Sequence, residues 1–373
     1  MTNQNLPYNK IIKPRNYGID LLRIVCMLMI PVLHILGHGG VLSSVIPFSM
    51  RFECAWLLES FCLCAVNCFV LITGYVYFSK KTKFYRVFAL WAEVLFYSII
   101  IFLVLLWLIP NQVTIDQVWP SFLPSLSNSY WFFTSYLGMF IFTPFINEGL
   151  NKFSKKQDLI AILLIFVILS FLPTIFNQTV AFNIKSGYSV LWFIVLYYIG
   201  GIIHKYELHN YLKNNKWLLV WIICCLMTLL LKNIVDLIYA NNTSSPFLAY
   251  NSPLYLIGSV AFSCFFINLK IRNKFSISII NFFAPVCFGV YLIHDNYLIR
   301  QYLMKNAFAF LANFNALSMT LLIIGFALAI FISCSLIDWI RELIFEKLEL
   351  KLRLANLEER INNRLDELLE NKT

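Results

Sequence analysis

The first long apolar stretch of the chain carries ionisable side chains at a helical spacing. Asp20, Arg23, His34 and His38 lie in or beside the apolar run 19–37, which is about long enough to cross a bilayer as a helix. Charged side chains are costly in such a run, so they point to function. Eleven helical residues advance by about 1100°, which puts Arg23 and His34 on one face about 16 Å apart. Asp20 and His38 extend the same face.

Two of these side chains suit a proton or group transfer. A histidine can take a proton from a hydroxyl near neutral pH, and we expect His34 to act as this base. A guanidinium holds two oxygens in a planar fork, so we expect Arg23 to bind a phosphate or carbonyl oxygen. Structural roles remain open. Arg23 would then be an anchor at the membrane surface paired with Asp20, and His34 a polar group bonded to a neighbouring helix.

The composition predicts the elements that position these residues. Of the 373 residues, 60% are hydrophobic and 13% are charged, and the mean hydropathy is +0.73. These values indicate an all-α polytopic integral membrane protein. We expect about ten transmembrane helices, at 19–37, 52–78, 87–109, 130–147, 158–176, 188–203, 217–239, 253–269, 276–299 and 316–340.

The distribution of lysine and arginine predicts the orientation. The N-terminal lead and the loops after even-numbered spans hold 16 of these residues, whereas the other loops hold four. Cytoplasmic loops are the richer ones in membrane proteins, so both termini should be cytoplasmic in a multi-pass protein of the cell membrane. The net charge of +10 is spread over these short loops, which argues against nucleic-acid binding. The cysteines lie within apolar runs, and we expect neither a disulfide nor a metal site from them.

Three regions follow from this division. Residues 1–18 form a cytoplasmic lead, and 19–345 form the transmembrane domain. Residues 346–373 carry many charges with leucines at helical spacing, which predicts a short amphipathic C-terminal helix in the cytoplasm. We expect this tail to lie on the membrane or against a partner, outside the path of the reaction.

The predicted topology brings several ionisable groups to one depth. His34 lies in the outer half of the first span, and Glu53 and Glu59 enter from the outside in the second. His294 and Asp295 lie at a similar level at the end of the ninth. We expect an aqueous site in the outer half, although each group alone fits a polar contact between helices.

Four stretches resemble the family-3 membrane acyltransferases. They are Tyr17-Gly-Ile-Asp20-Leu-Leu-Arg23 followed after ten residues by His34, Asn67 to Thr73-Gly74-Tyr75, Trp131 to Tyr136 continuing to Pro144-Phe-Ile-Asn147, and Phe288-Gly-Val-Tyr291-Leu-Ile-His294. Thr73 stands where serine is commoner in the family. The resemblance runs from residue 17 to about 340 and implies ten spans, with an arginine and a histidine of the first helix needed for activity.

The resemblance also implies an activity and its partners. The donor would be acyl-CoA, with acetyl-CoA as the expected form, and the acceptor a hydroxyl of a bacterial cell-surface polysaccharide or its lipid-linked precursor. Cell-wall or polysaccharide synthesis proteins are expected partners, and no metal is expected. Some family members carry an extracytoplasmic hydrolase-like domain, which is not seen here, so direct transfer and a separate partner both remain open. The expected catalytic residues are His34, Arg23 and Glu53, and the expected substrate-binding residues are Asp20, His38, Glu59, Asn67, Trp131, Tyr291 and His294.

Two other functions remain open at this stage. A transporter or exporter of a polysaccharide or small anion would use the same polar stripe as its pathway, although no internal repeat is visible and Pro31 and Pro285 are the mid-span prolines. A non-catalytic scaffold of cell-wall synthesis would use the tail for docking, but it does not account for His34.

Overall fold

The structure, a computed structural model, describes residues 15–127, 129–178, 181–239 and 245–370, and this part of the chain is helical without a strand. The predicted lead therefore lies mostly outside the described residues. The principal helices are α1 (Tyr17–Leu36), α2 (Val41–Ser44), α3 (Met50–Cys62), α4 (Cys64–Tyr77), α5 (Phe84–Leu108), α6 (Val118–Phe122), α7 (Trp131–Lys152), α8 (Lys155–Leu164), α9 (Leu172–Ile175), α10 (Val190–Lys205), α11 (Asn214–Ile238), α12 (Pro253–Ile267), α13 (Lys274–His294), α14 (Tyr297–Ile299), α15 (Ala316–Lys347) and α16 (Leu350–Glu370).

The helical membrane class expected from the sequence is confirmed. Within the described ranges, eight segments are long and apolar enough to cross a membrane, or nine if Ala181–Gly187 and α10, which meet at a bend of 75°, count as one span. The sequence predicted ten spans, and the predicted span that is absent from these nine is α7. This helix has 22 residues, which is about 33 Å, but polar side chains such as Asn147 and Glu148 lower its hydropathy.

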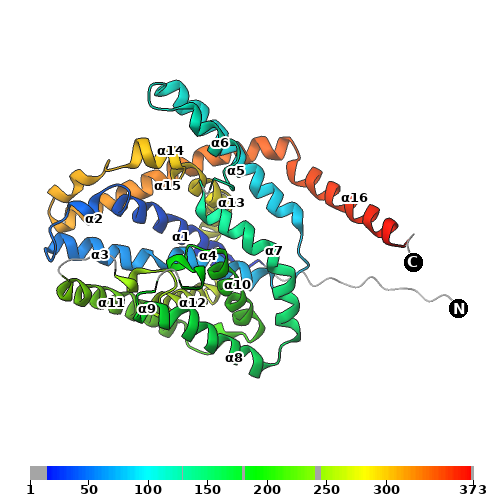
Figure 1. Cartoon of the computed structure of the whole chain (residues 1–373), viewed down its shortest axis with the longest axis horizontal. Helices are drawn as coiled ribbons and strands as arrows, with labels where there is room; N and C mark the ends of the chain where they lie inside the picture. Colours follow the sequence, from blue (N-terminus) through cyan, green and yellow to red (C-terminus); the bar gives the residue numbers. More distant parts are fainter. Residues whose placement is uncertain (1–14, 128, 179–180, 240–244, 371–373) are drawn as a thin grey trace.

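Helix α1 lies at the centre of the bundle. It contacts α3, α4, α12, α13 and α15, and Figure 1 shows it surrounded by the other long helices. Asn16 fixes where it begins. The Asn16 side chain accepts a hydrogen bond from the Gly18 N–H at 2.9 Å and donates one to the Ile267 carbonyl at 2.9 Å. This cap therefore joins the start of α1 to the end of α12.

Breaks in two predicted spans shape the wall around α1. The second span consists of α3 and α4, which meet at Leu63. The ninth span stops at His294 and continues as α14 and a π-helical turn, Arg300–Met304. The chain then bonds to the far end of α1, because the Asn306 N–H donates to the His38 carbonyl and the Phe308 N–H to the Gly39 carbonyl. Residues 295–308 are thereby held beside His38.

The two ends of the bundle differ in how many lysine and arginine residues their loops carry. At the basic end, α1, α5, α11 and α13 begin, and the connecting loops there hold most of the lysine and arginine residues that lie in loops between spans. At the loop end lie the connections near residues 38–49, 109–130 and 295–315. That the basic end faces the cytoplasm remains a prediction from the charge count.

Candidate active site

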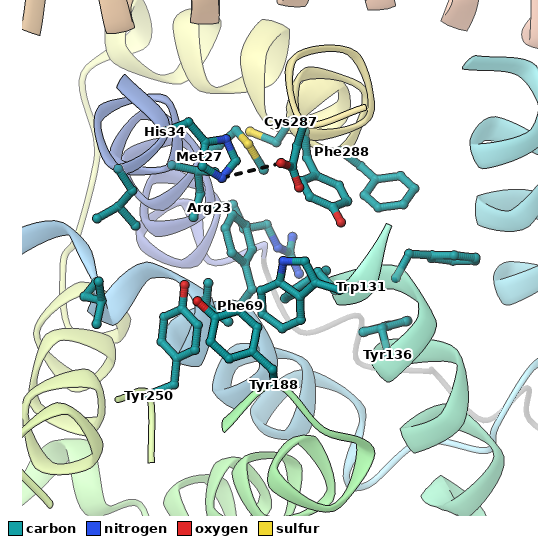
Figure 2. Close-up of a pocket in the computed structure, with 18 of the residues that line it drawn as sticks. Arg23, Met27, His34, Phe69, Trp131, Tyr136, Tyr188, Tyr250, Cys287 and Phe288 are labelled. Carbon is teal, nitrogen blue, oxygen red and sulfur yellow. Dashed lines mark ion pairs between the residues drawn. The ribbon is translucent and has the colours of Figure 1, made fainter. Parts of the chain in front are cut away.

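Helix α1 directs its polar face into a cavity of about 450 Å³. Arg23, His34 and His38 line this cavity, so the spacing in the sequence does place them on one wall. Figure 2 shows Arg23, Met27 and His34 extending from α1 into it. The remaining polar and aromatic lining residues are Glu59, Phe69, Thr73, Trp131, Phe132, Phe133, Tyr136, Tyr188, Tyr250, Phe288, Tyr291, Asp295 and Arg300. We call this space the histidine cavity.

His34 has a carboxylate beside it. Its Nε2 lies 3.6 Å from Asp295 Oδ1, the ion pair drawn as a dashed line in Figure 2. Arg300 Nη1 lies 3.3 Å from the same oxygen. Asp295 follows the last residue of α13, and burial raises the pKa of its carboxyl, a shift that Arg300 opposes. A base, an acid and a guanidinium thus meet at the loop end of the cavity.

Several buried polar atoms of the cavity wall have no hydrogen-bond partner among the described residues. They include Glu59 Oε2, the Tyr291 hydroxyl and both carboxylate oxygens of Asp295. His34 Nδ1 is likewise buried and unpartnered there, whereas Nε2 faces Asp295. Buried polar groups without a partner cost free energy, so a ligand that hydrogen-bonds them gains affinity. The polar chemistry of the cavity is therefore concentrated around His34, Glu59 and Asp295.

An aromatic cluster forms another side of the histidine cavity. The ring centroids of Trp131 and Tyr188 are 4.4 Å apart, and Trp131 stacks on Tyr250 at 5.9 Å with an interplanar angle of 19°. Figure 2 shows these three rings grouped across the cavity from His34. Asn67 positions one of them, since its Nδ2 donates to the Tyr250 carbonyl at 2.8 Å while its Oδ1 accepts from Trp192 Nε1 at 3.2 Å.

A second cavity, of about 340 Å³, opens at the basic end. Five cationic side chains line it: Lys80, Lys81, Lys83, Arg86 and Lys351. Glu93 is the acidic residue in this lining. The two cavities share the wall residues Thr73, Leu90, Tyr136, Pro285 and Phe288. We call this second space the basic cavity; it adjoins the part of the histidine cavity that lies farthest from the loop end.

The cluster at His34 also has the residue types of a metal site. One ligand atom each from His34, His38 and Asp295 lies within 4.8 Å of the others. Arg300, however, already places a positive charge 3.3 Å from the Asp295 carboxylate, and a second cation there would be repelled. The donor set therefore fits a metal poorly.

The structure separates the candidate residues into three groups: residues that line the histidine cavity, residues that lie behind its wall, and Glu53. Arg23, His34, His38, Glu59, Trp131 and Tyr291 line the histidine cavity. Asp20, Asn67 and His294 lie behind its wall. Asp20 pairs with Arg23 at 2.8 Å, and the ring centroid of His294 is 5.0 Å from that of His34. Those residues support the lining side chains.

The expectation that Glu53 is catalytic does not agree with its position in the structure. Its carboxylate accepts a hydrogen bond from Asn233 at 2.7 Å on α11, and it is absent from the described lining of both cavities. The helix α3 packs against both α1 and α11, and the Glu53 side chain bonds to α11. Glu53 therefore lies outside the candidate active site.

Among the charged and tyrosine side chains of the lining, Arg300, Tyr188 and Tyr250 were not predicted from the sequence. Arg300 had a signal, because it is one of four cationic residues in the loops that are poor in positive charge. Tyr188 and Tyr250 had none, since tyrosines near span ends are also ordinary interfacial anchors.

Comparison with known families agrees with this arrangement. Residues 16–338 match the acyltransferase domain of family 3. Searches of curated proteins and of solved structures found no match. Because the family match spans nearly the whole chain, the protein belongs to the family-3 acyltransferases and is a membrane acyltransferase.

Proposed function

We propose that the protein transfers an acyl group, with acetyl as the expected group, from acyl-CoA at the basic end to a hydroxyl of a surface polysaccharide or its lipid-linked precursor. The supporting observation is the adjacency of the two cavities. One carries five cations and the other carries His34, and they share wall residues including Tyr136 and Phe288. A donor whose phosphates bind in the basic cavity can extend its thioester toward His34 through this junction.

The charges favour this direction of entry. Acyl-CoA has phosphate groups at one end and the thioester at the other, and clustered lysine and arginine side chains bind phosphate. Arg23 lies on the same helix as His34 but about 16 Å toward the basic end. At that distance it does not reach a carbonyl oxygen held at His34. We therefore assign Arg23 to binding the donor along its length, where the two cavities approach each other.

The chemistry at His34 is a proton transfer coupled to attack on the thioester. With Nε2–H facing the Asp295 carboxylate, the other ring nitrogen of His34, Nδ1, takes the proton of the acceptor hydroxyl, and the hydroxyl oxygen forms a bond to the thioester carbonyl carbon. Asp295 stabilises the imidazolium that results, and Arg300 supplies positive charge near the developing oxyanion. The carbon–sulfur bond then breaks, and the CoA thiolate takes the proton back from His34. An ester and free CoA are the products.

The aromatic cluster favours a sugar as the acceptor. Trp131, Tyr188 and Tyr250 present flat apolar faces, while Glu59 on the same cavity wall offers an unpartnered carboxylate oxygen among the described residues. A sugar ring has an apolar face that packs on aromatic rings and hydroxyls that donate to carboxylates. The cavity thus combines both kinds of contact close to His34.

The proposal is tested with purified protein in lipid vesicles. Acetyl-CoA labelled in the acetyl group is supplied outside the vesicles and glycan acceptor is enclosed, and the glycan is then analysed for new O-acetyl esters by mass spectrometry. We expect ester formation by the wild type. A transporter would instead move label or glycan across the membrane without forming an ester. Loss of acetyl groups from the surface glycans of a deletion strain would identify the acceptor.

A further inference from the structure

The C-terminal helix α16 returns to the basic end and caps another helix. Glu358 accepts hydrogen bonds from the backbone N–H groups of Phe84 at 2.9 Å and Tyr85 at 3.1 Å, the first two residues of α5. The residue before them, Lys83, makes no capping hydrogen bond with its own side chain. The first N–H groups of a helix need acceptors, and a carboxylate also suits their partial positive charge. Glu358 thus supplies a cap that α5 lacks locally.

A chain of ion pairs joins the start of α16 to the bundle. Lys351 pairs with Glu342 at 2.8 Å, and Glu342 pairs with Arg341 at 2.5 Å. Arg341 is buried and forms two hydrogen bonds with Asp338, to which the Tyr97 hydroxyl of α5 donates at 2.7 Å. The tail is therefore fixed to both α5 and α15. It does not project freely from the last span, although Figure 1 shows its far end extending beyond the bundle.

Both attachments lie at the basic cavity. Lys351 itself is one of the five cations of its lining, and the other four come from the segment 80–86. That segment leads into the first turn of α5, which Glu358 caps. Residues 339–373 also lie beyond the family match, which ends at residue 338. The tail therefore lies outside the part of the chain that matches the family.

We propose that α16 is part of the acyl-donor site: Lys351 binds the phosphates of acyl-CoA, and Glu358 positions the cations of segment 80–86 by capping α5. This inference rests on the proposed function. It replaces the expectation that the tail lies outside the path of the reaction. Lys351 contacts substrate in this arrangement, whereas Glu358 is a positioning residue.

The test of Lys351 compares two donors and two lysines. Lys351→Ala should raise the KM for acetyl-CoA about three- to fivefold with kcat nearly unchanged, as expected for a partly exposed ion pair. The KM for the S-acetyl thioester of N-acetylcysteamine, which has no phosphate, should not change. Lys347→Ala is the matched control, because Lys347 is an exposed lysine of α15 absent from the described lining of both cavities. Equal KM values for the Lys351→Ala and Lys347→Ala proteins would overturn the assignment.

The test of Glu358 uses the adjacent Glu359 as its matched control. Glu358→Ala should raise the KM for acetyl-CoA, whereas Glu359→Ala, at an exposed position of the same helix, should behave as the wild type. A Glu358→Ala protein that loses activity equally with both donors would show a purely structural role and contradict the positioning proposal. Its elution in gel filtration reports whether it has folded, and if it has not, the Lys351→Ala protein alone decides whether α16 belongs to the donor site.

A lipid headgroup offers the same phosphate chemistry, so the assays are run in two kinds of vesicle. The Lys351→Ala effect should be the same in phosphatidylcholine vesicles and in vesicles that contain phosphatidylglycerol. An effect confined to phosphatidylglycerol would assign Lys351 to lipid and overturn the proposal. If the wild type itself transfers no acetyl group from acetyl-CoA, the proposed function fails. If it does and the Lys351 variant is normal, this inference alone fails.

Discussion

At the scale of single residues, His34 is set apart by its neighbours. Its Nε2 faces the Asp295 carboxylate, and Arg300 and His294 lie close behind that contact. A base oriented by a carboxylate is a common arrangement in enzymes that activate hydroxyl groups. The anchoring and purely structural interpretations do not account for Glu59 and Tyr291, which each have a buried polar atom without a hydrogen-bond partner among the described residues in the lining of the same cavity.

His34→Ala should lower kcat for acyl transfer by about 10²–10⁴-fold, because a general base typically contributes that much. The rate is measured with reconstituted protein, and gel filtration checks that the variant is folded. His209→Ala, outside the described lining of both cavities, is the matched control. Near-normal transfer by the His34 variant would reject its role as the base.

Arg23→Lys should lower kcat/KM for acetyl-CoA by about 10- to 100-fold, because an ammonium cannot replace the planar fork of a guanidinium and a charged hydrogen bond is worth about 1.5–3 kcal/mol. Arg51→Lys makes the same chemical change where the guanidinium binds the Ala312 carbonyl, away from both cavities, and should be close to wild type. Full activity of Arg23→Lys would mean that Arg23 is an anchor or a simple point charge.

At the scale of helices, glycine residues let backbones approach closely enough to form the cavity walls. A Cβ on Gly74 of α4 would lie 2.1 Å from the Tyr197 carbonyl oxygen, and one on Gly200 of α10 would lie 2.1 Å from that of Leu71. Association of helices in membranes depends on such small residues. The contact fixes α4, whose Thr73 lines both cavities, against α10.

Gly74→Ala should therefore destabilise the protein by about 1–3 kcal/mol, as overpacking of a tight contact does. The measurement is the thermal unfolding midpoint of the purified protein in detergent. Gly325→Ala is the control, because an added Cβ there meets no atom within 4 Å. Equal midpoints for the two variants would show that α4 and α10 can separate without loss of stability.

At the scale of the whole molecule, the arrangement separates the proposed donor site from the proposed acceptor site. The basic cavity opens at one end of the bundle, and the His34 cluster lies toward the other, with shared wall residues between them. An enzyme of this layout can use a donor on one side of a membrane and an acceptor on the other. The proposal therefore depends on which end faces the cytoplasm.

Cysteine labelling tests this orientation. A membrane-impermeant maleimide should label Asn111→Cys, at the loop end, in intact cells, and should label Lys213→Cys, at the basic end, only after the cells are opened. Both positions are exposed, and the native cysteines are buried or half-buried, so the wild type gives the background. The reverse pattern would place His34 on the cytoplasmic side and exclude the proposed direction of transfer.

The sequence alone was sufficient where the evidence is local and periodic. Length and hydropathy predicted the spans, because a helix that crosses a bilayer must satisfy its own backbone and be apolar. The eleven-residue spacing predicted that Arg23 and His34 share a face, because that relation depends only on helical geometry. The family resemblance, carried by motifs along the chain, is confirmed by the match over residues 16–338.

Only the tertiary structure shows which side chains meet in the cavities, because this depends on how each helix is rotated about its axis and where it breaks. Glu53 and Glu59 are six residues apart in the sequence, yet α3 turns the first toward Asn233 and the second into the histidine cavity. Asp295 and Arg300 are close together in the sequence, but they lie beside His34 because the ninth span ends at His294 and its continuation bonds to the residues that follow α1. Likewise, no periodicity in the tail could show that Glu358 meets the start of α5, 274 residues earlier. Such contacts are set by packing between distant segments, which local sequence patterns do not encode.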